Sequence, residues 1–290
     1  MPRRRLRSAP TALILLGCAT TLLAQATPAT LVPDRPGFTE TTQVVGPGVV
    51  QVEMGASLEI DGHGDARSRI LTAPLGLVRV GLTRRIELRV GDDGEVVQAI
   101  GRGPGHTTTV GGTDVEVGLK WTVLDRPSAG FALAFIPLLS VPLGSETTSS
   151  GSYDPTVELA WSQSLARGFE LGGNVNLSRL RDRDGRYQQE AVSLALAHGL
   201  GRAWEGYGET YGLMDLGHHR AQAWSVDGGV SHTVGQHLAL DVEVGRAVSR
   251  AAPDWFVGIG MGLRARPPRR ASAAPVTRST PARSGRPRRG

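Results

Sequence analysis

Polar or small residues, several of them charged, occupy every second position along several stretches of this chain. Glu53 and Glu59 lie in one such stretch, and Glu116 and Lys120 lie in another. A ring of carboxylates around a pore favours cations or positively polarised solutes. The chemistry that this spacing suggests is therefore selection of a solute by charge, with no bond made or broken.

The candidate residues share one property: each lies on the polar face of an alternating stretch. They are Glu53, Glu59, Glu87, Arg89, Glu116, Lys120, Glu158, Glu170, Asp227, Asp241 and Glu243. Two interpretations stay open. These residues line a polar lumen with an excess of carboxylate, or they pair with one another inside a closed interior.

Other kinds of chemistry find little support in the sequence. His218 and His219 are adjacent in a loop without cysteine or carboxylate at ligand spacing, so we expect no metal. Ser231 and His232 are neighbours and point to opposite faces of a strand, which disfavours a catalytic pair. The glycine-rich stretch 101–105 is not followed by a helix that could bind phosphate. We therefore expect no catalytic residue, no cofactor and no enzyme, with a lipid-directed hydrolase as the rival hypothesis.

The elements that carry these residues are strands. From 49 to 60 the sequence alternates apolar and polar residues, which indicates a strand with one face of each kind. Similar stretches recur to residue 265, and the connections between them alternate short and long. This pattern predicts a closed antiparallel transmembrane β-barrel of about 12 strands. Residues 131–141 are apolar on both faces, and the register of the strand from 204 to 211 stays open.

The loops follow the same alternation. We expect long loops at 92–112 and 142–155, where they could gate the lumen, and charged or polar loops at 181–189 and 214–220. In an outer-membrane barrel the longer loops are extracellular and the short turns periplasmic. The five tryptophans are expected at the headgroup level of the membrane.

The two ends of the chain differ from its middle. Residues 1–26 are typical of a signal peptide, with Cys18 as a rival lipidation site, and residues 27–48 are an extended lead-in that is periplasmic or folded into the barrel mouth. The barrel is expected at 49–265, and a disordered basic tail at 266–290. Because the basic residues gather at the ends, the pI of about 10.1 does not indicate a nucleic-acid partner.

The stretch DRPGFTE at 34–40, followed by the strand QVEMG, resembles the start of a bacterial outer-membrane transporter family named for the MetA pathway of phenol degradation. The stretches 77–91, 114–121, 138–145 and 258–266 are also similar to that family. The resemblance implies an outer-membrane barrel for small solutes, often hydrophobic or aromatic. It implies no particular binding residue.

The function expected from the sequence is passive diffusion of a small solute through a carboxylate-lined lumen in the outer membrane. The alternative is a closed barrel with a structural or surface-interaction role and no conductance. The expected partners are outer-membrane lipid, the solute and the barrel-assembly machinery. The oligomeric state and the identity of the solute stay open.

Overall fold

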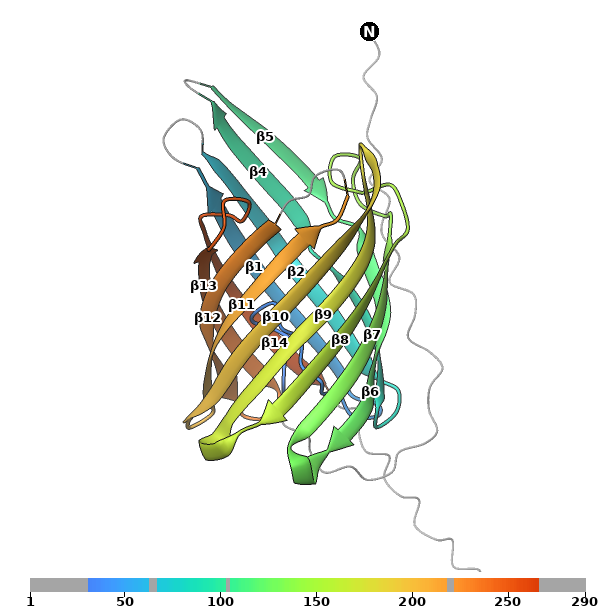
Figure 1. Cartoon of the computed structure of the whole chain (residues 1–290), viewed down its shortest axis with the longest axis vertical. Helices are drawn as coiled ribbons and strands as arrows, with labels where there is room; N and C mark the ends of the chain where they lie inside the picture. Colours follow the sequence, from blue (N-terminus) through green and yellow to red (C-terminus); the bar gives the residue numbers. More distant parts are fainter. Residues whose placement is uncertain (1–30, 63–66, 103–104, 218–221, 266–290) are drawn as a thin grey trace, which may run out of the picture.

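The computed structural model describes residues 31–62, 67–102, 105–217 and 222–265. The predicted signal peptide, the basic tail and the histidine pair at 218 and 219 lie outside these ranges. Within them the chain forms one antiparallel sheet that closes on itself (Figure 1). In the described part of the chain, no helix is both long and apolar enough to cross a membrane.

The strands have the following bounds: β1 Val50–Asp61, β2 Ser68–Gly81, β3 Ile86–Asp92, β4 Glu95–Arg102, β5 Gly105–Gly112, β6 Val115–Arg126, β7 Phe131–Val141, β8 Asp154–Ser164, β9 Phe169–Asp182, β10 Gly185–Gly201, β11 Trp204–Asp215, β12 Gln222–Val234, β13 Leu238–Ala247 and β14 Trp255–Ala265. Two single-turn 3₁₀ helices, Pro127–Ala129 and Ala166–Gly168, lie in the short turns.

The barrel closes where the first strand meets the last. β1 pairs with β14 in antiparallel register, from Val50 opposite Ala265 to Ile60 opposite Trp255. Closure leaves no free edge in the membrane, where lipid offers no hydrogen-bonding partner to backbone groups. Twelve strands form the wall, which confirms the predicted fold class.

The remaining two strands, β4 and β5, correct one prediction. Residues 92–112 were expected to form a loop, but most of them are strand. β4 pairs with β5 and with the first half of β2, so the β3–β6 hairpin continues past the barrel rim (Figure 1). Glycines and a proline along this stretch suggested a loop, yet the segments between them carry valine and threonine, which favour strands. Gly94, with φ +69°, lies at the break between β3 and β4.

A second correction concerns residues 181–189, which were also expected to be a loop. β9 continues to Asp182 and β10 begins at Gly185, so only two residues form the turn. The Asp182 carboxylate accepts hydrogen bonds from the backbone N–H groups of Asp184 (2.9 Å) and Gly185 (3.0 Å). Charged residues in this hairpin thus lie on strands, where their side chains alternate between the two faces of the wall.

The strand whose register the sequence left open is β11. It extends from Trp204 opposite His232 to Met214 opposite Gln222, and so includes residues that were expected in a loop. Its inner face carries Tyr207, Glu209 and Tyr211, whereas its outer face includes Gly206, Gly208 and Gly212. β7, which is apolar on both faces, places Ala134, Ile136 and Leu138 in a small buried cluster inside the wall.

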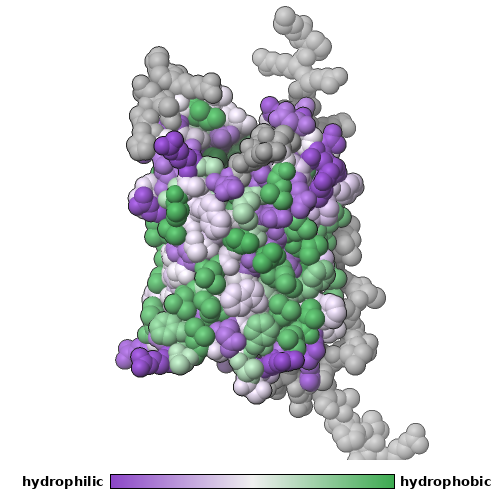
Figure 2. Space-filling view, in the orientation of Figure 1, coloured by the Kyte–Doolittle hydropathy of each residue, from purple (hydrophilic) through white to green (hydrophobic). Residues whose placement is uncertain are grey.

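The exterior has the pattern of a membrane protein. Figure 2 shows apolar residues over the middle of one face and hydrophilic residues at its two ends. Leucine, valine and isoleucine side chains on alternate strand positions are well exposed along the wall. Such an apolar band flanked by polar rims is what a barrel in the outer membrane presents to lipid.

Candidate functional site

The segment 31–49 precedes β1 and lies inside the barrel rather than outside it (Figure 1). Leu31 and Val45 are 3% and 2% exposed. An interior of this width cannot be filled by the wall's own side chains. The segment fills part of it and contacts strands on several sides of the lumen.

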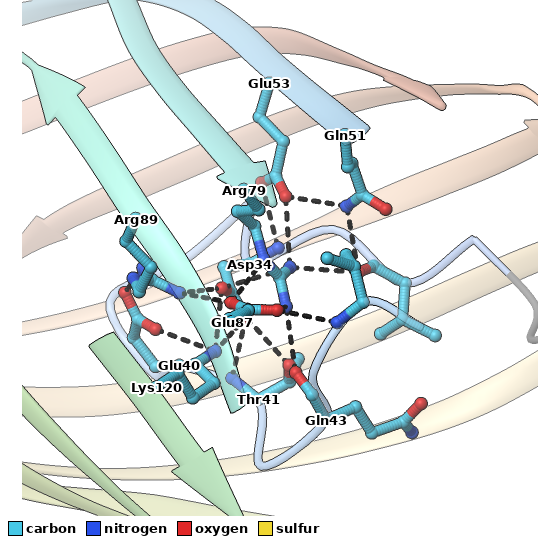
Figure 3. Close-up of polar contacts among 12 residues, drawn as sticks. Asp34, Glu40, Thr41, Gln43, Gln51, Glu53, Arg79, Glu87, Arg89 and Lys120 are labelled. Atoms are coloured by element: carbon cyan, nitrogen blue, oxygen red, sulfur yellow. Dashed lines mark hydrogen bonds and ion pairs between the residues drawn. The ribbon is translucent and has the colours of Figure 1, made fainter. Parts of the chain in front are cut away.

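Asp34 is the centre of a buried ionic cluster (Figure 3). Its carboxylate accepts hydrogen bonds from Lys120 Nζ, at 2.7 Å to each oxygen, and from Arg89 Nη1. Arg79 Nη1 lies 3.1 Å from Asp34 Oδ2. The Thr41 backbone N–H and hydroxyl donate to the same carboxylate, at 3.2 and 2.7 Å. One carboxylate of the segment therefore holds three cations of the wall.

The wall supplies two further carboxylates to this cluster. Glu53 Oε2 accepts the backbone N–H of Asp34 at 2.9 Å, and Glu53 Oε1 accepts Arg79 Nη1 at 3.1 Å. Glu87 accepts Arg79 Nε at 2.8 Å and the backbone N–H of Val45 at 2.6 Å. Both glutamates are completely buried. Wall residues thus bind the backbone of the segment as well as its side chains.

Glu40 is the second carboxylate that the segment contributes. It pairs with Arg89 Nη2, and its Oε2 lies 3.0 Å from Lys120 Nζ. Three cations and four carboxylates are thereby gathered in one buried cluster: Arg79, Arg89 and Lys120 with Asp34, Glu40, Glu53 and Glu87. Removing one partner from such a set leaves an uncompensated buried charge, which is costly.

The electrostatic state of Asp34 follows from this geometry. Burial alone would raise the pKa of Asp34, but the charges of Arg79, Lys120 and Arg89 outweigh it and hold the pKa well below its usual value. The carboxylate is therefore ionised at any pH near neutrality, and the cluster stays paired.

The other side of the lumen holds the segment through backbone groups. Glu209 on β11 accepts the N–H groups of Phe38 and Thr39, the latter at 2.9 Å, and Glu243 on β13 accepts that of Gly37 at 3.0 Å. The Phe38 ring stacks on Tyr211, with 4.6 Å between centroids. The segment is thus tied to opposite walls and crosses the lumen.

Gly37 is needed where the segment turns. Its φ is +96°, a region that L side chains rarely adopt, and an added Cβ would lie 2.7 Å from Glu209 Oε1. Only glycine lets the backbone approach the glutamate this closely.

Two hydroxyl contacts complete the attachment. Thr39 Oγ1 donates to Ser193 Oγ on β10 at 2.7 Å, and Thr42 Oγ1 lies 3.1 Å from Ser162 Oγ on β8. Beyond Thr42, a cavity of about 620 Å³ remains at the short-turn end of the barrel. Residues 42–44, turn residues and the ends of β6 to β9 line it. The segment therefore crosses the lumen without filling it.

The candidate residues from the sequence are distributed unevenly around this segment. Glu53, Glu87, Arg89 and Lys120 meet in the ionic cluster, whereas Glu243 binds the segment from the other side. Glu170 lines the cavity at the short-turn end.

The remaining candidates lie outside the cluster. Glu158 Oε1 accepts Asn176 Nδ2 at 3.1 Å, and Asp241 lies 3.9 Å from Arg35 Nη2. Glu116 interacts electrostatically with Glu40 and Arg89, Glu59 with Asp93, and Asp227 with Glu209 and Glu243. These carboxylates lie along β1, β6, β8, β12 and β13 and form no single site.

Sequence reasoning missed the residues of the segment itself, above all Asp34, Glu40 and Gly37, and the wall residue Glu209. The charged motif at 34–40 was the available signal, since it carried the family resemblance but was assigned no contact.

Ser193 and His198, both on β10, lie on opposite faces of the wall. Ser193 is inside, bonded to Thr39, whereas His198 is outside and stacks on Phe169 with 4.2 Å between centroids. His232 likewise stacks outside, on Trp204. Among the described residues, no group of three or more His, Cys, Asp or Glu is arranged to hold a metal ion.

Comparison with known proteins gives one match over most of the chain. The family model described as "Putative MetA-pathway of phenol degradation" matches residues 33–265. Among curated proteins, none matches the sequence significantly.

Solved structures with a similar fold include an outer membrane channel from Pseudomonas putida F1, at 12% identity and a TM-score of 0.55 over 79% of this chain and 99% of that chain. The NanC porin, at 10% identity and a TM-score of 0.48, is matched over 74% of this chain and 98% of that chain. The first of these likenesses supports the barrel fold.

Proposed function

The chain belongs to the MetA-pathway phenol-degradation family, and from that premise we propose that it is an outer-membrane channel for small solutes whose lumen is gated by residues 31–49. The observation that carries this proposal is the ionic cluster around Asp34, which ties a non-barrel segment across the lumen. A segment held by side-chain contacts can be released, whereas a wall strand cannot leave without opening the barrel.

The proposed path runs beside the segment. On the short-turn side it continues into the cavity lined by Thr42, Thr122 and Ser162, whose hydroxyl groups suit a small polar or aromatic solute. The family description names phenol degradation, which makes aromatic compounds the first solutes to test. The carboxylates Glu116, Asp227 and Asp241 give the path its cation preference.

The second candidate function is a closed barrel without conductance. The ionic cluster favours it in one respect, because Glu53 and Glu87 are used in internal pairing and do not face solvent. The two proposals differ in whether the segment moves, and a covalent lock on the segment separates them.

Thr39→Cys with Ser193→Cys provides such a lock, since the two hydroxyl oxygens are 2.7 Å apart. Single-channel currents of the purified double variant would be recorded in planar bilayers before and after a thiol reductant. We expect few openings in the oxidised form and wild-type openings after reduction, with either single variant as the control. Equal currents in the oxidised and reduced forms would contradict the gate. If the folded protein shows no channel openings in either form, the closed barrel is favoured.

A further inference from the structure

Four arginines gather on the β9–β10 hairpin at the long-loop end of the barrel. Arg179 and Arg181 lie on β9, Arg183 in the turn and Arg186 on β10, and all four are exposed. Arg179 and Arg181 follow Val175 and Leu177 on the outward face of β9, and Arg186 precedes Leu194 and Leu196 on the outward face of β10. In this group, called here the outer arginine cluster, Arg179 and Arg181 therefore point away from the lumen.

The height of this cluster on the wall can be worked out from the strand. Ten residues separate Phe169, at the short-turn end of β9, from Arg179. At about 3.3 Å per residue and a tilt of about 40°, they span about 25 Å along the barrel axis, which is the height of the apolar band in outer-membrane barrels. Arg179 therefore lies at the outer edge of the band, at the level of lipid headgroups. In Figure 2, hydrophilic residues gather at the same end of the wall.

The positive charges of the cluster are close together, which favours binding of an anion. Arg181 lies directly opposite Arg186 in the sheet register, and like charges in that position repel each other. Within the described parts of the chain, Arg186 is the only one of the four with an ion pair, at 3.3 Å to Asp154. The acidic residues of the hairpin are Asp182 at the end of β9, whose carboxylate accepts hydrogen bonds from the turn backbone, Asp184 in the turn, and Glu190 on β10 opposite Leu177.

Arg186 differs from the other three, because its side chain is held at the barrel rim by buried residues, Asp154 at the start of β8 and Ser152 in the loop before it. Its Nη2 donates to Ser152 Oγ and, at 3.3 Å, to the carbonyl of Tyr153, whose side chain is 60% exposed. Arg186 is thus already paired, and the exposed guanidinium groups left for a ligand outside the wall are those of Arg179 and Arg181. Guanidinium groups suit phosphate because their planar donors match its oxygens.

We propose that the outer arginine cluster binds the phosphate groups of lipopolysaccharide, the phosphorylated glycolipid of the outer leaflet. The acyl chains of the lipid lie against Val175, Leu177 and Leu194, while its phosphates pair with Arg179 and Arg181. The bound phosphate supplies Arg179 and Arg181 with the counter-charge that no described residue gives them as an ion pair. This role is independent of solute passage through the lumen.

The test uses the full-length chain refolded in lipid-free detergent and titrated with lipopolysaccharide, with the midpoint of thermal unfolding as the readout. The test variant carries both Arg179→Gln and Arg181→Gln. The control variant carries both Arg126→Gln and Arg202→Gln, and so loses the same charge from exposed sites at the short-turn end. The apparent affinity of the first variant should fall by about 30-fold, at about fivefold per arginine. The control should bind like the wild type.

Two further arms identify the ligand. Dephosphorylated lipopolysaccharide should raise the unfolding midpoint little, and inorganic phosphate at the same concentration should not reproduce the effect. Without lipid, the arginine variant should be at least as stable as the wild type, because a like-charge contact is lost. A folding defect would instead lower its unfolding midpoint in lipid-free detergent. The proposal would be overturned if the test variant bound lipopolysaccharide as tightly as the wild type. It would also be overturned if dephosphorylated lipopolysaccharide or free phosphate raised the unfolding midpoint as much as lipopolysaccharide does.

Discussion

Replacing Asp34 by asparagine should open the lumen. The carboxylate meets Lys120 at 2.7 Å and Arg79 at 3.1 Å and accepts a hydrogen bond from Arg89, in a place where its side chain is only 3% exposed. Asparagine has the same size but no charge, so the three cations lose their common partner while the barrel wall keeps its backbone pairing.

The magnitude follows from the burial of this cluster. Removing one partner of a buried ion pair costs about 3–5 kcal/mol. Since each 1.4 kcal/mol is a factor of ten, the ratio of docked to released segment should fall by roughly two to three and a half orders of magnitude. The contacts of Glu209 and Glu243 with residues 37–39 remain, so release of the segment near Asp34 should come first.

The assay is open probability in planar bilayers, with Asp61→Asn as the matched control. Asp61 is exposed at the end of β1, so its replacement changes the charge equally and leaves the cluster intact. Both variants should keep the heat-modifiable mobility of a folded barrel. If folded Asp34→Asn protein opens no more often than the wild type, the ionic cluster does not hold the gate. A triple variant that carries Asp34→Asn together with Thr39→Cys and Ser193→Cys should open rarely again under oxidising conditions, because the disulfide holds the segment in place.

Three further predictions follow from the same geometry. The pKa of docked Asp34 lies well below the value of about 3.9 that a free Asp has, so the contribution of Asp34 to docking is fully present above pH 4 and is lost as the pH falls through the docked pKa. If Asp34 controls the segment, openings should not increase between pH 7 and 4. Gly37→Ala should raise open probability, because φ +96° and a close carboxylate oppose a Cβ, whereas Gly151→Ala, at φ +63° with open space around it, should not. Glu116→Gln with Asp241→Asn should lower the cation-over-anion permeability ratio, measured from reversal potentials in a salt gradient.

Each of these predictions has an outcome that contradicts it. Openings that rise at pH 5 to 6 would show that groups other than Asp34 control the segment. Equal currents from the two glycine variants would mean that the approach of Gly37 to the wall does not matter for closure. An unchanged reversal potential after neutralising Glu116 and Asp241 would place the selective region elsewhere in the lumen.

The sequence predicted the barrel because alternation is a local property. Val50, Val52 and Met54 each face lipid for the same reason, and that reason can be read without knowing their neighbours in space. The same logic assigned Glu53, Glu87, Arg89 and Lys120 to one side of their strands. It failed at 92–112 and 181–189, where glycine and charged residues suggested loops but cross-strand pairing extended the sheet.

What the tertiary structure alone decided is the partner of each polar group. Asp34 is 19 residues from Glu53 and 86 from Lys120 along the chain, so no spacing in the sequence relates them. Closure of β1 on β14 brings the walls around residues 31–49, and the buried cations must then find a carboxylate because water is excluded there. The sequence by itself determined which face of each strand is polar. Only the closed barrel decided that the segment before β1 would lie between those faces.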